Sequence, residues 1–164
     1  MITQSTNHIS DNLIEITTFN NGILQKLETI DIHTCKLNGP YKEFFENGQL
    51  SYEMNYLNGV LNGPYKEYYS DGKLWVEKNY LNGILNGPYK SYYDNGQLSG
   101  EITYINGIEH GTFKRYYDNG QLYIEANYIN GKLHGTFKSY LSNGQLWLEK
   151  NYINGKEQND NTIN

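Results

Sequence analysis

The chain has 164 residues, a formal net charge of −5, 37 % hydrophobic residues and 15 % aromatic residues. This aromatic content excludes disorder throughout the chain, because disordered segments carry few rings, while the apolar fraction lies below the roughly 45–50 % of compact globular domains. The single cysteine excludes a disulfide scaffold and a cysteine-based zinc site, and the acidic balance argues against nonspecific binding to nucleic acid or anionic lipid.

The first 38 residues differ from the rest of the chain. Residues 1–11 have neither the basic nor the apolar region of a secretory signal, and no apolar run is long enough to span a bilayer. We therefore expect a cytoplasmic protein, in which residues 1–11 are disordered. Residues 12–38 echo the following segment, because 19–24 resembles 45–50, and we predict a degenerate capping hairpin there.

Residues 39–155 repeat with a period of 24 residues. Glycine opens each of five units, and each unit also keeps one leucine, one tyrosine, one lysine and one glutamate in fixed columns. The units span 39–62, 63–86, 87–110, 111–134 and 135–155. The polar tail, 156–164, is expected to be disordered.

Each unit is predicted to be a β-hairpin, because it holds two Asn-Gly or Asp-Gly pairs between β-prone runs. The first pair, 47–48 in the first unit, predicts a two-residue type I′ turn, in which both central residues need positive φ. Such a tip places Phe44 opposite Ser51 and Phe45 opposite Leu50. The second pair, 58–59, makes either a tight turn or part of a wider loop over 58–63.

This register places a lysine opposite a glutamate in every unit, and a slip of one residue would lose all five pairs. Each cross-strand pair contributes only about 0.2–1 kcal/mol, so the pairs mainly specify the register. We interpret them as structural rather than as acid–base catalysts. The pairs are Lys42 with Glu53, Lys66 with Glu77, Lys90 with Glu101, Lys114 with Glu125, and Lys138 with Glu149.

The alternation of side chains along the strands separates two faces. The more apolar face carries Tyr41, Tyr52 and Tyr56 in the first unit, and the lysine–glutamate pairs lie on the other. On this second face we predict ring pairs near the tips, namely Tyr68 with Trp75, Tyr116 with Tyr123, and Tyr140 with Trp147.

The rings of the second face are the candidate partner-binding residues, because tyrosine and tryptophan are typical of interfaces. Their alternative role is to cover the backbone of a one-layer sheet. The column that reads Ser, Trp, Ser, Tyr, Trp favours binding, since it varies beside an invariant ladder. The candidates are Phe44, Tyr68, Trp75, Tyr92, Tyr116, Tyr123, Tyr140 and Trp147.

The expected fold is all-β: tandem 24-residue β-hairpins that form an elongated, twisted, single-layer antiparallel sheet, since one such hairpin cannot bury a face alone. No metal or cofactor is expected. His110 and His134 occupy equivalent columns, but adjacent units would hold them about 10 Å apart, too far for one zinc ion. Cys35 lies two residues from His33, which leaves a reactive thiol open.

The unit YYDNGQLxxExxYINGKLHGTFK, residues 116–138, resembles the MORN-repeat variant family. The matching elements are the aromatic pair before Asn-Gly, the leucine after it, the second Asn-Gly, and the closing His-Gly ahead of an aromatic residue. The resemblance implies a β-hairpin solenoid that binds a partner and has no catalytic domain. Bacterial chains of such repeats are often labelled antitoxin-like partners of toxins, and the original MORN family is associated with membrane junctions and phospholipids.

We therefore expect a non-catalytic protein-binding repeat module, an antitoxin or immunity partner that occludes a toxic and basic protein. The open alternative is a module that binds a glycan or a lipid headgroup between the aromatic rows. An enzyme is the third hypothesis. The sequence leaves the oligomeric state and the identity of the partner open.

Overall fold

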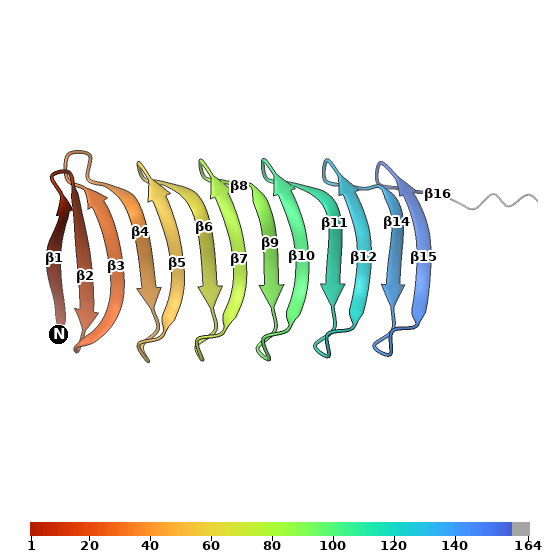
Figure 1. Ribbon diagram of the computed structural model, residues 1–164, viewed down its shortest axis with the longest axis horizontal. Helices are drawn as coiled ribbons and strands as arrows, with labels where there is room; N and C mark the ends of the chain where they lie inside the picture. The colour runs from red at the N-terminus through yellow and green to blue at the C-terminus, as the bar shows by residue number, and fades with distance from the viewer. Residues whose placement is uncertain (159–164) are drawn as a thin grey trace, which may run out of the picture. The chain divides into compact units, whose positions relative to one another are not determined.

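A computed structural model describes residues 1–158, which form sixteen β-strands and no helix (Figure 1). The chain divides into two compact units, residues 1–85 and residues 86–164. Within each unit every strand pairing is antiparallel and joins strands that follow one another in the sequence, except that β12 also pairs with β14. The predicted all-β class of tandem hairpins is confirmed.

The first unit contains eight strands. They pair in chain order, and the short β8 pairs with β7. They are β1 (Ile2–Ser10), β2 (Leu13–Asn20), β3 (Ile23–Asp31), β4 (Lys36–Phe44), β5 (Leu50–Leu57), β6 (Val60–Tyr68), β7 (Leu74–Leu81) and β8 (Ile84–Leu85).

The second unit also contains eight strands within its described residues, 86–158. Here β13 and β14 share the neighbour β12, because His134, between them, belongs to neither strand. The strands are β9 (Gly87–Tyr92), β10 (Leu98–Ile105), β11 (Ile108–Tyr116), β12 (Leu122–Ile129), β13 (Lys132–Leu133), β14 (Gly135–Tyr140), β15 (Leu146–Ile153) and β16 (Lys156–Gln158).

Both ends of the chain differ from the prediction. Residues 1–11 were expected to be disordered, yet β1 pairs along its length with β2. All nine residues of β1 are exposed, so backbone hydrogen bonds hold a strand whose sequence shows no apolar alternation. In the tail, residues 156–158 form β16 against β15, and residues 159–164 lie outside the described part. Residues 12–38 form the hairpin β2–β3 and the start of β4.

The type I′ turn occurs at the second Asn-Gly pair of each unit. Asn58 and Gly59 both have positive φ, 53° and 84°, and Leu57 lies opposite Val60 across this two-residue turn. Asparagine tolerates this left-handed conformation better than other non-glycine residues do. The tight-turn alternative of the sequence analysis is therefore the correct one, and the turn recurs with positive φ at Asn82, Asn106, Asn130 and Asn154.

The hairpin tip at the first Asn-Gly pair is wider than predicted. The Gly48 amide donates to the Phe45 carbonyl at 2.9 Å, and the Phe45 amide donates to the Gln49 carbonyl at 2.8 Å. Of the loop residues 46–48, only Gly48 has positive φ, as in a type I turn followed by a left-handed glycine. The predicted two-residue type I′ tip is wrong.

A β-bulge beside the tip restores the predicted register. Phe44 lies opposite Leu50, the next pair is Glu43 with Tyr52, and Ser51 is the extra residue. The three-residue loop shifts the pairing by one position and the bulge shifts it back. All five predicted lysine–glutamate pairs are therefore confirmed as register partners, although Phe44 does not pair with Ser51. The equivalent bulged residues are Trp75, Ser99, Tyr123 and Trp147.

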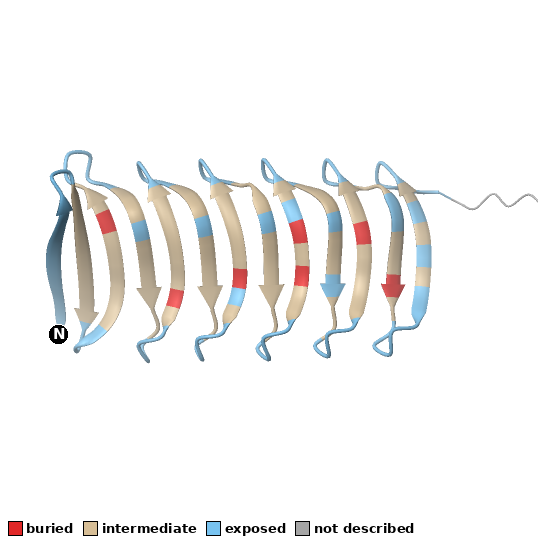
Figure 2. Ribbon diagram, viewed as in Figure 1, coloured by how far each residue is buried: buried red, intermediate tan, exposed pale blue. Residues whose placement is uncertain are grey.

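The buried core is small. The hydrophobic residues classed as buried are Val76, Ile102 and Ala126, which are 5 %, 7 % and 2 % exposed (Figure 2). Each lies opposite a residue of the predicted apolar face, since Val76 pairs with Glu67, Ile102 with Tyr89 and Ala126 with Phe113. Pairing between neighbouring strands must therefore supply much of the stability, as in other repeat arrays.

The two turn types lead to a prediction at Asn106, whose φ is 51°. Asn106→Ala should lower the free energy of unfolding by about 1 kcal/mol, because alanine is strained in the left-handed region. Asn106→Gly should keep the free energy of unfolding within a few tenths of a kcal/mol of that of the parent chain. Urea denaturation followed by circular dichroism checks both variants, and an alanine variant as stable as the parent would contradict the type I′ assignment.

Candidate interaction surface

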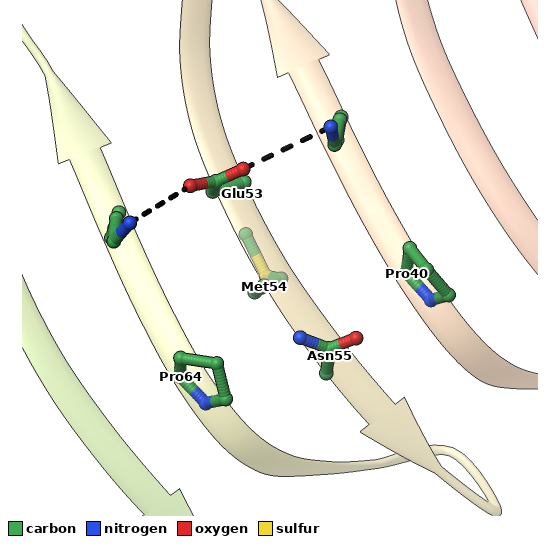
Figure 3. A pocket seen from close by; sticks show the side chains of 7 residues that line it. Pro40, Glu53, Met54, Asn55 and Pro64 are labelled. Atoms are coloured by element: carbon green, nitrogen blue, oxygen red, sulfur yellow. Dashed lines mark ion pairs between the residues drawn. The ribbon is translucent and has the colours of Figure 1, made fainter.

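One face of each unit carries the lysine–glutamate pairs, and we call it the ladder face. In the first unit Glu53 lies between Lys42 and Lys66, with Nζ–Oε distances of 3.9 and 3.5 Å (Figure 3). Pro40 and Pro64 lie on the strands of the two lysines, on either side of Asn55, and border a hollow of about 250 Å³ with the cluster. In the second unit the Nζ–Oε distances are 3.7 Å for Lys114 with Glu125 and for Lys138 with Glu149.

The ladder is better suited to structure than to chemistry. The glutamate side chains in these ion pairs remain 30–45 % exposed, and such surface pairs contribute only about 0–1 kcal/mol each. The Tyr68 hydroxyl also donates to Glu53 at 2.7 Å, and the Tyr116 hydroxyl donates to Glu101 at 3.2 Å. These carboxylates are engaged with neighbouring strands, which fits the structural interpretation of the pairs.

Five of the eight candidate partner-binding residues end the first strand of a hairpin, and all five are half-buried. Because of the bulge, each lies opposite a leucine rather than opposite a bulged residue. The predicted ring pairs Tyr68–Trp75, Tyr116–Tyr123 and Tyr140–Trp147 are therefore wrong as register partners. The observed pairs are Phe44 with Leu50, Tyr68 with Leu74, Tyr92 with Leu98, Tyr116 with Leu122, and Tyr140 with Leu146.

The bulged residues turn away from the ladder face. The Trp75 ring contacts Tyr69, with centroids 5.8 Å apart, and the hydroxyl of the bulged Ser99 lies 2.8 Å from that of Ser91, which lies on the face opposite to Lys90. Similarly, the Tyr123 ring lies 4.8 Å from that of Tyr117. Their predicted position on the ladder face is wrong, because the bulge breaks the alternation on which that prediction rested.

Exposure distinguishes the bulged residues from one another. Trp75 is 43 % exposed and Trp147 is 69 % exposed, whereas Tyr123 is half-buried. Ser51 is 6 % exposed at the same position of the first repeat. The fold thus accepts a small polar residue at this position, and the two tryptophans present large apolar surfaces that it does not require. Their role in partner binding stays a prediction.

The other face, which we call the ring face, carries an aromatic pair in each hairpin. The rings in each pair meet edge to face, an arrangement that contributes about 0.5–1.5 kcal/mol beyond burial. This confirms the more apolar face predicted from the sequence. The centroid distances are 5.8 Å for Tyr41–Tyr56, 5.9 Å for Tyr65–Tyr80, 6.1 Å for Tyr89–Tyr104, 6.0 Å for Phe113–Tyr128 and 6.3 Å for Phe137–Tyr152.

The sequence analysis missed a third surface, formed by aliphatic residues that flank the type I′ turns. We call it the turn ridge, and its side chains are 38–51 % exposed. The available signal was an aliphatic residue on each side of most second Asn-Gly pairs. The ridge consists of Leu57, Val60, Leu81 and Ile84 in the first unit, and of Ile105, Ile108, Ile129 and Ile153 in the second.

The candidate metal and thiol residues are not brought together. Among residues 1–158 no three side chains of His, Cys, Asp or Glu cluster as a metal site would require. The His33 Nε2 atom lies 3.0 Å from the Asn12 Oδ1 atom, so this imidazole is engaged by Asn12. Cys35 is an exposed free cysteine in a turn, with φ of 54°.

A family model described as MORN repeat variant matches five consecutive segments, 37–58, 61–82, 85–106, 109–130 and 133–154, which together cover more than half of the chain. The chain belongs to the MORN repeat variant family. Each matched MORN segment ends at the asparagine of a type I′ turn. One MORN repeat is therefore a strand, a three-residue tip loop and a bulged return strand.

Other comparisons add little to this MORN assignment. No curated protein matches the chain. Among solved structures, the S. aureus TarM mutant in complex with Fondaparinux, alpha-GlcNAc-glycerol and UDP matches at 10 % identity with a TM-score of 0.32, over 80 % of this chain and 21 % of that one. A second TarM structure matches at 11 % identity with a TM-score of 0.32, over 79 % and 20 %.

The MORN chain thus spans about a fifth of the length of these TarM structures. Within residues 1–158 the chain forms no helix that is long and apolar enough to cross a bilayer.

The packing of the ring face predicts how stability depends on pH. Burial raises the pKa of Tyr41 and Tyr65, and nearby glutamates raise it further. An unfolded tyrosine titrates near pH 10, so the folded chain holds these protons more tightly than the unfolded chain does. The resulting stabilisation is complete below about pH 10 and is lost as the pH rises beyond that value.

We expect the urea midpoint to be constant between about pH 8 and pH 9 and to fall above about pH 10, as tyrosinate forms preferentially in the unfolded chain. Urea denaturation at each pH, with tyrosinate absorbance followed in parallel, measures this. A midpoint that stays constant well above pH 10 would contradict the packing of the ring face.

Proposed function

We propose that this MORN chain is a non-catalytic protein-binding module, an antitoxin or immunity partner that binds a toxic protein and occludes it. The proposal is carried by the exposure of Trp75 and Trp147 at bulge positions where other repeats hold serine. The fold does not need a large ring there. Exposed tryptophans are the side chains that contribute most often to binding energy at protein interfaces.

The turn ridge supports the same proposal. Each unit exposes four aliphatic side chains of the ridge, which flank the two-residue turns. Large exposed apolar side chains that gather in one patch are typical of interaction sites. A rigid sheet that presents apolar side chains at its turns can dock without reorganisation, which lowers the entropic cost of association.

The charge distribution indicates the kind of protein that would bind. The first unit has ten acidic residues and six basic ones, whereas residues 86–164 have eight acidic and seven basic ones. Most of the negative charge therefore belongs to the first unit. A basic partner would be steered toward it, and this gain in association rate falls as salt is added.

The proposal that the chain is not an enzyme rests on the state of its carboxylates. The repeated glutamates Glu53, Glu125 and Glu149 lie beside lysines. A general acid or base needs a carboxyl group that is free to exchange a proton with a substrate. The mechanism proposed instead is steric: the bound MORN chain covers the partner's working surface.

Two serine substitutions test the proposal. The partner would be captured from the source cells with the full chain, identified, and then purified for titration. Trp75→Ser with Trp147→Ser should weaken its binding at least tenfold and leave the circular dichroism spectrum unchanged, because repeats one and three already carry serine. Ile2→Ser with Ile9→Ser is the matched control, since both isoleucines are exposed on β1, which lies outside the five repeats.

The alternative of a glycan or lipid-headgroup ligand enters as a second arm of this experiment. The full chain would be tested against vesicles with anionic headgroups and against a glycan array. Binding to these surfaces without binding to any purified protein would overturn the proposal. Binding of the purified protein at parent strength by the double serine variant would overturn it as well.

A further inference from the structure

Gly100 is the one glycine of the described residues whose φ is not positive. It is buried within β10 and lies on the ring face, where it pairs with Ser91 on one side and with Arg115 on the other. A glycine inside a strand weakens it and often marks a place where a ligand approaches. The equivalent residues of the other hairpins are large, namely Tyr52, Val76, Ile124 and Leu148.

Gly100 lines a hollow of about 320 Å³ within the second unit. A Cβ atom at Gly100 would lie 3.4 Å from the Ser91 Oγ atom and 3.7 Å from the Arg115 Cγ atom, so both side chains border the space. The Ser99 Oγ atom lies 2.8 Å from the Ser91 Oγ atom. The hollow has the size of small-molecule sites, which occupy about 300–1,000 Å³.

The positive end of the hollow is also an exception to the repeat. Arg115 is the single arginine of the chain. Its column holds Glu43, Glu67 and Ser139 in other hairpins, and the arginine is exposed. Within residues 1–158 no carboxylate forms an ion pair with Arg115. A guanidinium suits bidentate binding of a planar carboxylate, and the Ser91 hydroxyl, which is hydrogen-bonded to Ser99, borders the same hollow.

The opposite end of the hollow carries a negative charge. Glu109 replaces the leucine found at Leu37, Leu61 and Leu133, and it is half-buried with the Tyr104 hydroxyl 3.5 Å from its Oε1 atom. Since Glu109 and Arg115 are six residues apart on β11, their charges lie at opposite ends of the hollow. The rings of Tyr89 and Phe113 line the space between them.

Three departures from the repeat thus meet in one cavity. Gly100 lacks the large side chain of the other hairpins, Arg115 adds a positive charge, and Glu109 places a negative charge at the other end of the cavity. We propose that this cavity binds a small organic carboxylate with an aromatic body, with its carboxylate on Arg115 and Ser91 and its body against Tyr89 and Phe113. Glu109 repels the anionic end and so fixes the orientation. This site is separate from the partner contacts at Trp75 and Trp147.

The test uses phenylacetate as the probe and phenylacetamide as its uncharged control, titrated into the full chain by calorimetry or ligand-observed NMR. Phenylacetate should bind at least tenfold more tightly than phenylacetamide, because only the anion engages Arg115. Gly100→Val should abolish binding and raise the melting temperature, since valine occupies this position in β7 and fills the cavity. The melting temperature also reports that the variant is folded.

Arg115→Glu supplies a second, independent variant, because glutamate stands at the equivalent Glu43 and Glu67. It should weaken phenylacetate binding at least tenfold. Lys132→Glu makes the same change of net charge at an exposed position on β13 and should leave binding unchanged. Equal binding of acid and amide, undiminished binding to Gly100→Val or Arg115→Glu, or no binding of phenylacetate at millimolar concentration would overturn the proposal.

Discussion

The bulged residue beside each hairpin tip controls which residues face each other across the sheet. Its physical cause lies in the tip, where only Gly48 and its equivalents take a left-handed conformation and the loop has three residues. Such a loop alone would move every lysine out of line with its glutamate. The extra residue, Ser51 in the first repeat, restores the register within two positions. The ladder, the ring pairs and the type I′ turns all depend on this compensation.

The same feature explains why a surface for binding can vary without loss of the fold. A bulged residue has no direct partner on the opposite strand, so its side chain is not constrained by a cross-strand pair. Serine, tyrosine and tryptophan all occur there, while Lys114 and Glu125 beside it keep the ladder. Gly100, next to the bulged Ser99, lies on the ring face and lines a cavity there.

Much of the fold could be predicted from the sequence, because the 24-residue period and the lysine–glutamate columns constrain the register strongly. The turn types could not, since Asn-Gly is compatible with both a type I′ turn and a left-handed glycine after a type I turn. The wrong tip length did not affect the predicted lysine–glutamate pairs, because the bulge restores their register. It did affect the residues between the tip and the bulge, so Tyr68 lies opposite Leu74 instead of Trp75. The polar β1 carries no apolar alternation, so only its backbone pairing reveals it.

The candidate site was predictable in composition but not in position. Trp75 and Trp147 were identified from their variable column, yet a bulge reverses the face to which such a column belongs. The turn ridge was visible as aliphatic residues around the second Asn-Gly pairs, but its exposure depends on a tight turn that the sequence left open. Gly100 is the one glycine that the 24-residue period places inside a strand column, but only the pairing of the strands identifies its neighbours Ser91 and Arg115.

Backbone NMR of the hairpin β11–β12 tests the compensating bulge most directly. Cross-strand nuclear Overhauser effects should connect Lys114 with Glu125 and Tyr116 with Leu122, and Tyr123 should have no direct cross-strand partner. Contacts that connect Tyr116 with Tyr123 and Tyr117 with Leu122 would instead establish a two-residue tip without a bulge, and would contradict the account.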